Sequence, residues 1–264
     1  MEKLAIMGAL KRHSMAPDIA QSVISALPDH AIGVLLYGSY ARTDFTPDSD
    51  VDLLLLRSRP AGTIESDRIS VSTYTPTQLA SAAGTLFGMH LARDGVVLHD
   101  TQGQLRSLLA KMGEPVPQEL FSRIRHLAAV LDVAEHDEDK YIAGLTRVAR
   151  YLLRTAIYVS AIDQGEPCFS VRELAVRFND PDLLTMLSAN PAVSGPPSVG
   201  GVTELRQRLK DVVGPLVTNS HGALRNLVVA EWYEDPDRAT LGTLALTRDN
   251  DSVFDYAALP KVLL

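Results

Sequence analysis

Short apolar runs alternate with helical patterns through the first part of the chain. Residues 32–37 and 51–56 are continuous runs of mostly large apolar residues bounded by turn formers, which predicts two buried strands. Residues 69–75 alternate apolar and polar positions and predict a third strand, and residues 95–100 are a candidate for a fourth. Residues 15–27 carry apolar side chains at helical spacing. Together these patterns predict a small sheet with an amphipathic helix packed on it.

A domain boundary is expected where the helical pattern of this first part stops. A capping box, Thr75-Pro76-Thr77-Gln78, predicts one helix start, and helical patterns then lead to residue 112. Residues 113–117 contain one glycine and two prolines, which end the preceding helix. We therefore expect one domain over residues 1–113 and a second over residues 118–264.

The second part of the chain is predicted to be all helical. A second capping box, Ser170-Val171-Arg172-Glu173, and the pair Asp180-Pro181 each predict a helix start. The expected helices are 119–134, 140–162, 170–178, 180–189, 203–213 and 220–233. A segment rich in Pro, Gly and Ser, residues 190–201, predicts a loop, and the tail after about residue 235 has a mixed pattern. The predicted fold class is α+β, a small mixed β-sheet domain with flanking helices followed by an all-helical bundle domain.

The first two predicted strands frame a Gly-Ser pair and two aspartates. Gly38 and Ser39 follow the first strand directly, ten residues intervene, and Asp50 and Asp52 come at the start of the second strand. Because side chains two apart on a strand share a face, Asp50 and Asp52 are expected side by side, with Val51 turned into the core.

These residue types at this spacing point to chemistry on phosphates. Two neighbouring carboxylates without a cation repel each other and lose hydration, whereas Mg²⁺ removes that cost and leaves coordination positions for phosphate oxygens. Gly38 lets the backbone approach a ligand, and the Ser39 hydroxyl and the N–H groups after it can hold phosphates, helped by a helix beginning near Tyr40. A D-x-D alone would favour a hairpin with a solvated acidic turn. The Gly-Ser at this spacing favours phosphoryl or nucleotidyl transfer instead.

The segment GSYARTDFTPDSDVDLLLL resembles the nucleotidyltransferases of the polymerase-beta superfamily, most closely the minimal and aminoglycoside-type enzymes. Their pattern, G-S-x10-D-x-D, is matched by Gly38, Ser39, Asp50 and Asp52, and the resemblance covers roughly residues 15–100. It implies that Asp50 and Asp52 are catalytic and bind one or two Mg²⁺ ions. It also implies that Gly38 and Ser39 bind the phosphates of a nucleoside triphosphate.

The third strand departs from the family pattern. Members of the family usually carry a third carboxylate on the strand beside the D-x-D, where it helps bind metal and takes the proton of the attacking hydroxyl. The matching positions here are Ser70 or Ser72, and serine is neither a strong metal ligand nor an effective base. Glu65 and Asp67, just before this strand, are candidate substitutes, and Asp94 and Asp100 are more distant ones. His90 is a candidate base, and no motif supports any of these residues. The apolar helical pattern around His90 favours a satisfied, partly buried histidine.

Three arginines form a stripe on the long helix predicted at residues 140–162. Arg147, Arg150 and Arg154 lie at helical spacing beside the apolar stripe of that helix. One interpretation is a solvated face. The other is that they bind the triphosphate, since related two-domain nucleotidyltransferases close a helical domain over the nucleotide. The segment from Tyr151 to Ser170 resembles the HEPN-like helical domains that accompany minimal nucleotidyltransferases, but it lacks their R-x4-6-H motif, so we expect no ribonuclease activity.

Composition narrows the partners and the compartment. The formal net charge of −7 gives no general attraction for nucleic acid, which favours a small molecule or a protein over a long nucleic acid as acceptor. A single cysteine, Cys168, excludes an internal disulfide. No apolar run has the length of a membrane span, so we expect a cytoplasmic protein without a membrane partner. A homodimer is a candidate assembly.

Two functions follow from the sequence. The first is a Mg²⁺-dependent nucleotidyltransferase that moves a nucleoside monophosphate from a nucleoside triphosphate to an acceptor hydroxyl and releases pyrophosphate. The alternative is a catalytically inactive nucleotide-binding or antitoxin-like regulatory module that retains the fold. The missing third carboxylate is the observation that favours this alternative.

Overall fold

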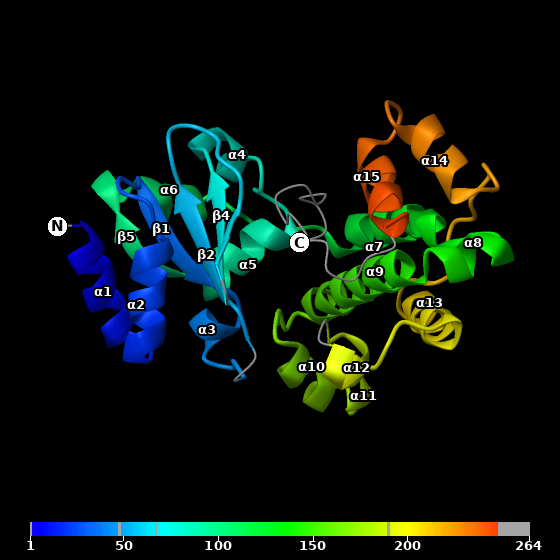
Figure 1. Cartoon of the computed structure of the whole chain (residues 1–264), viewed down its shortest axis with the longest axis horizontal. Helices are drawn as coiled ribbons and strands as arrows, with labels where there is room; N and C mark the ends of the chain where they lie inside the picture. The colour runs from blue at the N-terminus through cyan, green and yellow to red at the C-terminus, as the bar shows by residue number, and fades with distance from the viewer. Residues whose placement is uncertain (1, 47–48, 67, 189–190, 248–264) are drawn as a thin grey trace. The chain divides into compact units, whose positions relative to one another are not determined.

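The structure, a computed structural model, describes residues 2–46, 49–66, 68–188 and 191–247. Contacts divide the chain into two compact units, of which the first extends to Pro115 and the second begins at Val116. Strands and helices build the first unit, whereas the described part of the second is helical (Figure 1). The predicted α+β fold class is confirmed.

One mixed sheet organises the first unit. Within the described residues it has five strands in the order β3-β4-β2-β1-β5. The strands are β1 (Gly33–Tyr37), β2 (Val51–Leu56), β3 (Ile64–Ser66), β4 (Ile69–Tyr74) and β5 (Val96–Asp100). The β2 and β4 strands run parallel, and the other neighbouring pairs are antiparallel. All four strands expected from the sequence are therefore present.

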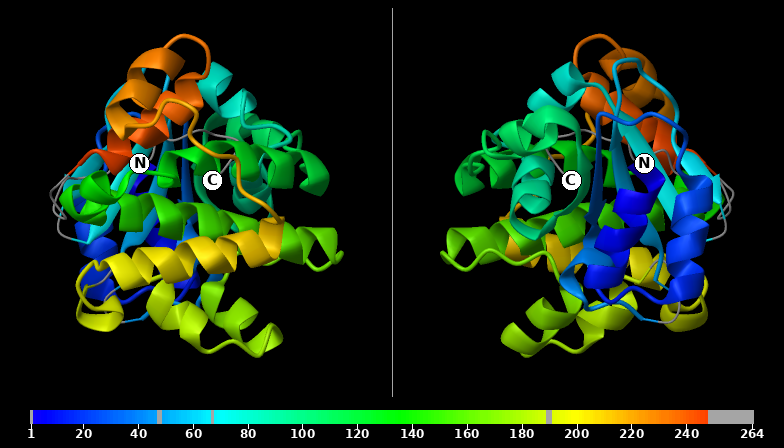
Figure 2. Two further views of the ribbon diagram at one scale, coloured as in Figure 1. Left: turned by 90° about the vertical axis from the view of Figure 1, so that its right-hand side faces the viewer. Right: turned by 90° about the vertical axis from the view of Figure 1, so that its left-hand side faces the viewer.

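Alternation along β2 separates the two faces of the sheet. Val51 and Leu53 belong to a buried core shared with α1 (Glu2–Arg12) and α2 (Pro17–Ala26). These two helices lie side by side over that face, as the right-hand view of Figure 2 shows. Because neighbouring residues on a strand point to opposite faces, Asp52 points away from these helices.

Three short helices lie toward the opposite face: α4 (Pro76–Ala80), α5 (Leu86–Asp94) and α6 (Gln104–Leu109). The ring of Tyr74, at the end of β4, lies 5.7 Å from the ring of Phe87 in α5. The predicted capping box at the start of α4 is formed. Asp52 thus points to the face on which α5 packs.

The second unit consists of helices around one long central helix. Its α-helices are α7 (Pro117–Leu127), α8 (Glu135–Lys140), α9 (Ile142–Asp163), α10 (Val171–Arg177), α11 (Asp182–Met186), α12 (Pro191–Ser194), α13 (Val199–Val213), α14 (Leu224–Glu231) and α15 (Pro236–Ala245). The helices α7, α13 and α15 pack on α9, and α13 runs beside it (Figure 2, left). At Gly144 in α9 a side chain would overlap the backbone of Ala245, so glycine allows α15 to end against α9.

Several elements differ from the sequence prediction. The β3 strand is absent from the sequence prediction, because its three residues are too few to display an alternating pattern. The α1 helix occupies a segment with a weak pattern, and α15 lies in the tail whose structure was left uncertain. The predicted loop at 190–201 contains α12 and the first residues of α13. In the described residues, no helix combines the length and apolar character needed to span a bilayer.

Candidate functional site

Gly38 brings the turn after β1 into contact with β2. The α3 helix (Gly38–Arg42) begins at Gly38 itself, two residues before the predicted start. Gly38 has a φ of +72°, a left-handed conformation that side chains disfavour. A Cβ atom there would overlap Oδ2 of Asp52 and lie 3.2 Å from its Cγ. Glycine is therefore required both by the backbone conformation and by the space that the carboxylate occupies.

The sheet register places the second aspartate at the end of β1. In the antiparallel β1–β2 pair, Tyr37 lies opposite Asp52. Val51 is 1% exposed and packs into the core, as predicted, whereas Asp52 is partly buried and Asp50 is exposed. Ser39 follows Gly38 in the first turn of α3. Gly38 and Asp52, which the motif separates along the chain, thus meet in the fold.

The two carboxylates of the D-x-D influence each other. Burial, followed by the negative charge of Asp50, raises the pKa of Asp52 to about 7, and the Arg42 guanidinium opposes this rise. Burial also raises the pKa of Asp50, against the lowering effect of Arg68. A site that makes ionisation of an aspartate this costly is suited to a cation that neutralises both groups.

The two carboxylates of Asp50 and Asp52 fit a Mg²⁺ site in which substrate oxygens supply further ligands. In the residues that the structure describes, no three His, Cys, Asp or Glu side chains are grouped as metal ligands. Mg²⁺ is commonly held by one or two carboxylates together with waters and substrate phosphates. Asp50 and Asp52 supply two carboxylates, and the turn at Gly38 lies beside one of them.

The parallel pairing of β2 and β4 identifies the position where the third carboxylate of related enzymes would lie. Ser70 is the register partner of Asp52, and Ser72 is the partner of Leu54. Of the two serines that the sequence left open, Ser70 is therefore the neighbour of the acidic pair. Glu65 on β3 lies opposite Ser70, two strands from Asp52, and Asp67 lies outside the described residues.

The more distant substitutes are engaged elsewhere. The side chain of Asp100 accepts hydrogen bonds from the backbone N–H groups of Leu105 (2.8 Å) and Arg106 (3.0 Å), so it holds the start of α6. Asp94, at the end of α5, has Oδ2 3.9 Å from Nη1 of Arg42. These contacts indicate structural roles for both carboxylates.

His90 is held neutral. Nη1 of Arg42 lies 3.1 Å from Nε2 of His90, and the imidazole meets the Tyr37 ring edge-on at 6.1 Å between centroids. Burial, then the charges of Arg42 and Arg93, lowers the pKa of His90 to about 3. Such a weakly basic imidazole is unsuited to general-base catalysis near neutral pH. This favours the interpretation of His90 as a satisfied, partly buried histidine.

Arg42 is a residue that the sequence analysis did not single out. Its guanidinium lies 3.4 Å from a carboxylate oxygen of Asp44 and contacts His90 and Asp94 as described above. It also favours the ionised form of Asp52. Its position in the sequence could have indicated a role at the site, because Arg42 comes three residues after Ser39 and ends the helix that begins at the Gly-Ser pair.

The arginine stripe is bound within the second unit. Nε of Arg150 donates to the carbonyl oxygen of Met186 at 3.0 Å, and Nη2 of Arg154 donates to the carbonyl of Leu187. Arg147 has Nη1 3.5 Å from Oγ1 of Thr247. Arg150 and Arg154 therefore hold the carbonyl end of α11. Their role in nucleotide binding stays a prediction.

A comparison with protein families agrees with this geometry. Residues 18–78 match the family model of the nucleotidyltransferase domain, a span that includes β1 to β4, Gly38, Ser39, Asp50 and Asp52. A search of curated proteins found no match to the chain. The first unit thus contains a nucleotidyltransferase domain, consistent with the polymerase-beta type, and a helical unit follows it.

Proposed function

We propose that the protein is a metal-dependent nucleotidyltransferase, which moves a nucleoside monophosphate from a nucleoside triphosphate to an acceptor hydroxyl. The observation that carries the proposal is the packing of Gly38 against Asp52, whose carboxylate is in turn influenced by Asp50. This arrangement brings a phosphate-binding turn and a pair of metal-binding carboxylates to one point of the sheet.

The residues have distinct tasks in this proposal. The Gly38 backbone and the Ser39 hydroxyl bind the β- and γ-phosphates, while Asp50 and Asp52 hold one or two Mg²⁺ ions. When bound, Mg²⁺ neutralises developing charge on the phosphates. The acceptor hydroxyl oxygen forms a bond to the α-phosphorus and gives up its proton to solvent water. The bond from that phosphorus to the bridging oxygen breaks, and pyrophosphate leaves with the electron pair of that bond.

The protonation of Asp52 sets a condition for binding. With a pKa of about 7 in the absence of metal, the Asp52 carboxyl is only partly ionised near neutral pH. Binding of a cation requires the ionised form and therefore releases a proton. Arg42 favours this ionisation, so it assists loading of the site without contacting the phosphates in this proposal.

The position of Ser70 supports the alternative, a nucleotide-binding or antitoxin-like regulatory module without turnover. A base positioned for the acceptor hydroxyl accelerates such reactions by roughly 10²–10⁴-fold. Ser70 offers a hydroxyl in the register position beside Asp52, where related enzymes carry a carboxylate. The intact pair of aspartates and the Gly38 turn favour the enzyme.

The acceptor is proposed to be a small molecule or a protein. The net charge of −7 disfavours a long nucleic acid, which is itself a polyanion. Arg147, Arg150 and Arg154 are proposed to contribute to triphosphate binding from the helical unit. The partly buried guanidinium of Arg150 has a lowered pKa, caused by burial and then by Arg154, as expected for two cations held close together.

Two measurements separate the enzyme from the binding module. Calorimetry with a non-hydrolysable ATP analogue and Mg²⁺ reports binding, and a pyrophosphate-release assay with hydroxyl-bearing small molecules and proteins reports turnover. Mg²⁺-dependent binding with pyrophosphate release supports the transferase. Binding without release for every acceptor favours the module, and absence of Mg²⁺-dependent binding contradicts both.

A further inference from the structure

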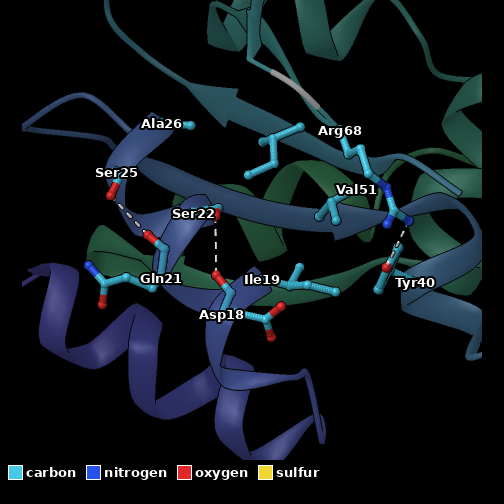
Figure 3. A pocket seen from close by; sticks show the side chains of 10 residues that line it. Asp18, Ile19, Gln21, Ser22, Ser25, Ala26, Tyr40, Val51 and Arg68 are labelled. Atoms are coloured by element: carbon cyan, nitrogen blue, oxygen red, sulfur yellow. Dashed lines mark hydrogen bonds between the residues drawn. The ribbon is translucent and has the colours of Figure 1, made fainter. Parts of the chain in front are cut away.

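A hollow lies on the face of the sheet opposite Asp52. It is a cavity of about 500 Å³ between α2 and the start of β4, lined among others by Ile19, Val51 and Arg68 (Figure 3). We call it the α2–β4 groove. Its volume is in the range of small-molecule sites. Val51 lines this groove, whereas Asp52 points to the other face of the sheet.

Arg68 presents donors to one end of the groove. Its Nη2 donates to the carbonyl oxygen of Ser49 at 2.5 Å and to the hydroxyl oxygen of Tyr40 at 3.5 Å. A guanidinium has five N–H donors in a planar fork. Among the described residues, no acceptor forms a hydrogen bond with the N–H groups on Nε and Nη1 of Arg68. No carboxylate of a described residue lies within ion-pair distance of the Arg68 guanidinium. Guanidinium donors in this arrangement match a carboxylate or a phosphate.

The other end of the groove offers acceptors. The hydroxyl of Ser22 donates its proton to the carbonyl oxygen of Asp18 at 3.1 Å, and that of Ser25 donates to the carbonyl of Gln21 at 3.0 Å. With its proton used in this way, each hydroxyl oxygen still has lone pairs for a ligand. Figure 3 shows these α2 side chains across the groove from Arg68 and Tyr40. A complementary ligand therefore carries hydroxyl groups away from its anionic end.

We propose that the α2–β4 groove binds a small hydroxylated organic anion. The anionic group lies on Arg68 and the Tyr40 hydroxyl, and the hydroxyl groups lie on Ser22 and Ser25. Because Arg68 also holds Ser49, the residue before Asp50, the occupant reaches the segment that carries the first aspartate. The proposal does not depend on nucleotidyl transfer.

Calorimetry on the full chain without Mg²⁺ tests the site with four probes. Glycerol 3-phosphate and glycerate combine an anion with hydroxyls, whereas inorganic phosphate and glycerol each supply one part alone. We expect glycerol 3-phosphate or glycerate to bind at least ~10-fold more tightly than both single-part probes, since two sets of contacts act together. Comparison of the affinities of glycerol 3-phosphate and glycerate shows whether the groove prefers a phosphate or a carboxylate. If neither exceeds the single-part probes, the proposal is wrong.

Variants locate the binding. Arg68→Met is expected to weaken the tighter probe at least ~10-fold, because a charged hydrogen-bond partner is lost. Arg59→Met, which removes another exposed arginine of the same unit, is expected to leave the affinity unchanged. Tyr40→Phe keeps the ring stacked on Phe45, at 4.3 Å between centroids, and removes only the hydroxyl. We expect it to weaken binding several-fold, which keeps the test valid if Arg68→Met fails to fold.

The same measurement on a Ser39→Ala/Asp52→Asn double variant distinguishes this groove from the nucleotide site. Unchanged probe affinity there, with loss in Arg68→Met, supports the groove whatever becomes of the transferase proposal. Loss of probe affinity in the double variant, with unchanged affinity in Arg68→Met and Tyr40→Phe, places the anion at the Gly-Ser turn and overturns the inference.

Discussion

Gly38 lies directly against the carboxylate of Asp52, so that any side chain at residue 38 would overlap Oδ2. The motif reveals these two residues as members of one pattern, but the fold makes them neighbours through the antiparallel pairing of β1 and β2. The space beside the acidic pair is therefore kept open by the absence of a side chain. The predictions below start from this contact.

Gly38→Ala is expected to abolish Mg²⁺-dependent triphosphate binding, because the added methyl group displaces the Asp52 carboxylate. Gly84→Ala is the matched control, since Gly84 has a φ of +75° and no atom within 4 Å of an added Cβ. Both variants incur the left-handed backbone cost of ~1–2 kcal/mol, so both should lower the melting temperature. Calorimetry with the ATP analogue should separate them. Equal affinities in the two variants would refute the role of the contact.

Asp50→Asn and Asp52→Asn are each expected to reduce Mg²⁺-dependent triphosphate binding at least ~100-fold, because each removes an ionised oxygen ligand. The fold should persist, as judged by circular dichroism. Asp18→Asn changes an exposed aspartate on the other side of the sheet and should have no effect on this binding. Wild-type affinity in the Asp50/Asp52 double variant would exclude the metal-site assignment.

The metal-free protein should lose stability as pH rises. The folded-state pKa of Asp52, about 7, exceeds the ordinary value of 3.8, so the folded state holds its proton more tightly. Its stabilising contribution is complete below pH 3.8 and declines as the pH rises to about 7. Asp52→Asn should therefore be more stable than the wild type by ~4 kcal/mol at pH 8 and nearly equal at pH 4, since each pKa unit corresponds to ~1.4 kcal/mol. Denaturant unfolding at both values measures this, and an equal difference at pH 4 and pH 8 would contradict it.

Ser70→Asp is expected to increase pyrophosphate release at least ~10-fold, because it places a carboxylate in register with Asp52, where it can accept a proton. It should also increase Mg²⁺ affinity and, without metal, lower the melting temperature through repulsion. Ser72→Asp, one alternation further along β4, is the control and should give no gain. No change in either rate or Mg²⁺ affinity in Ser70→Asp would show that the register position is outside the reaction site.

Arg147→Ala should weaken triphosphate affinity several-fold if the stripe contributes to the nucleotide site. Arg150→Met serves as the structural comparison, because it removes a hydrogen bond to the Met186 carbonyl and should cost ~1 kcal/mol of stability. Calorimetry measures the triphosphate affinity of both variants, and thermal unfolding measures their stability. A dissociation constant unchanged in Arg147→Ala returns that residue to a structural or solvated role.

The local patterns of the sequence were sufficient to predict four of the five strands of the described sheet and the placement of Asp50 and Asp52 at the start of one strand. The apolar runs before Gly38 and around Asp52 predicted β1 and β2, and the two-residue period placed Val51 and Asp52 on opposite faces of the sheet. Such signals are local, because strand and helix periodicity is visible within a few residues. The β3 strand was not predicted, because three residues are too few to show a two-residue alternation of apolar and polar side chains.

Only the tertiary structure decided which distant residues meet. The sequence left Ser70 and Ser72 as equal candidates, and the parallel register of β2 and β4 selected Ser70. Likewise, the helical pattern around His90 does not determine its pKa. In the fold, burial and the neighbouring charge of Arg42 lower the pKa of His90 to about 3. Register and desolvation depend on segments far apart in the chain, and a pattern read along the chain contains neither.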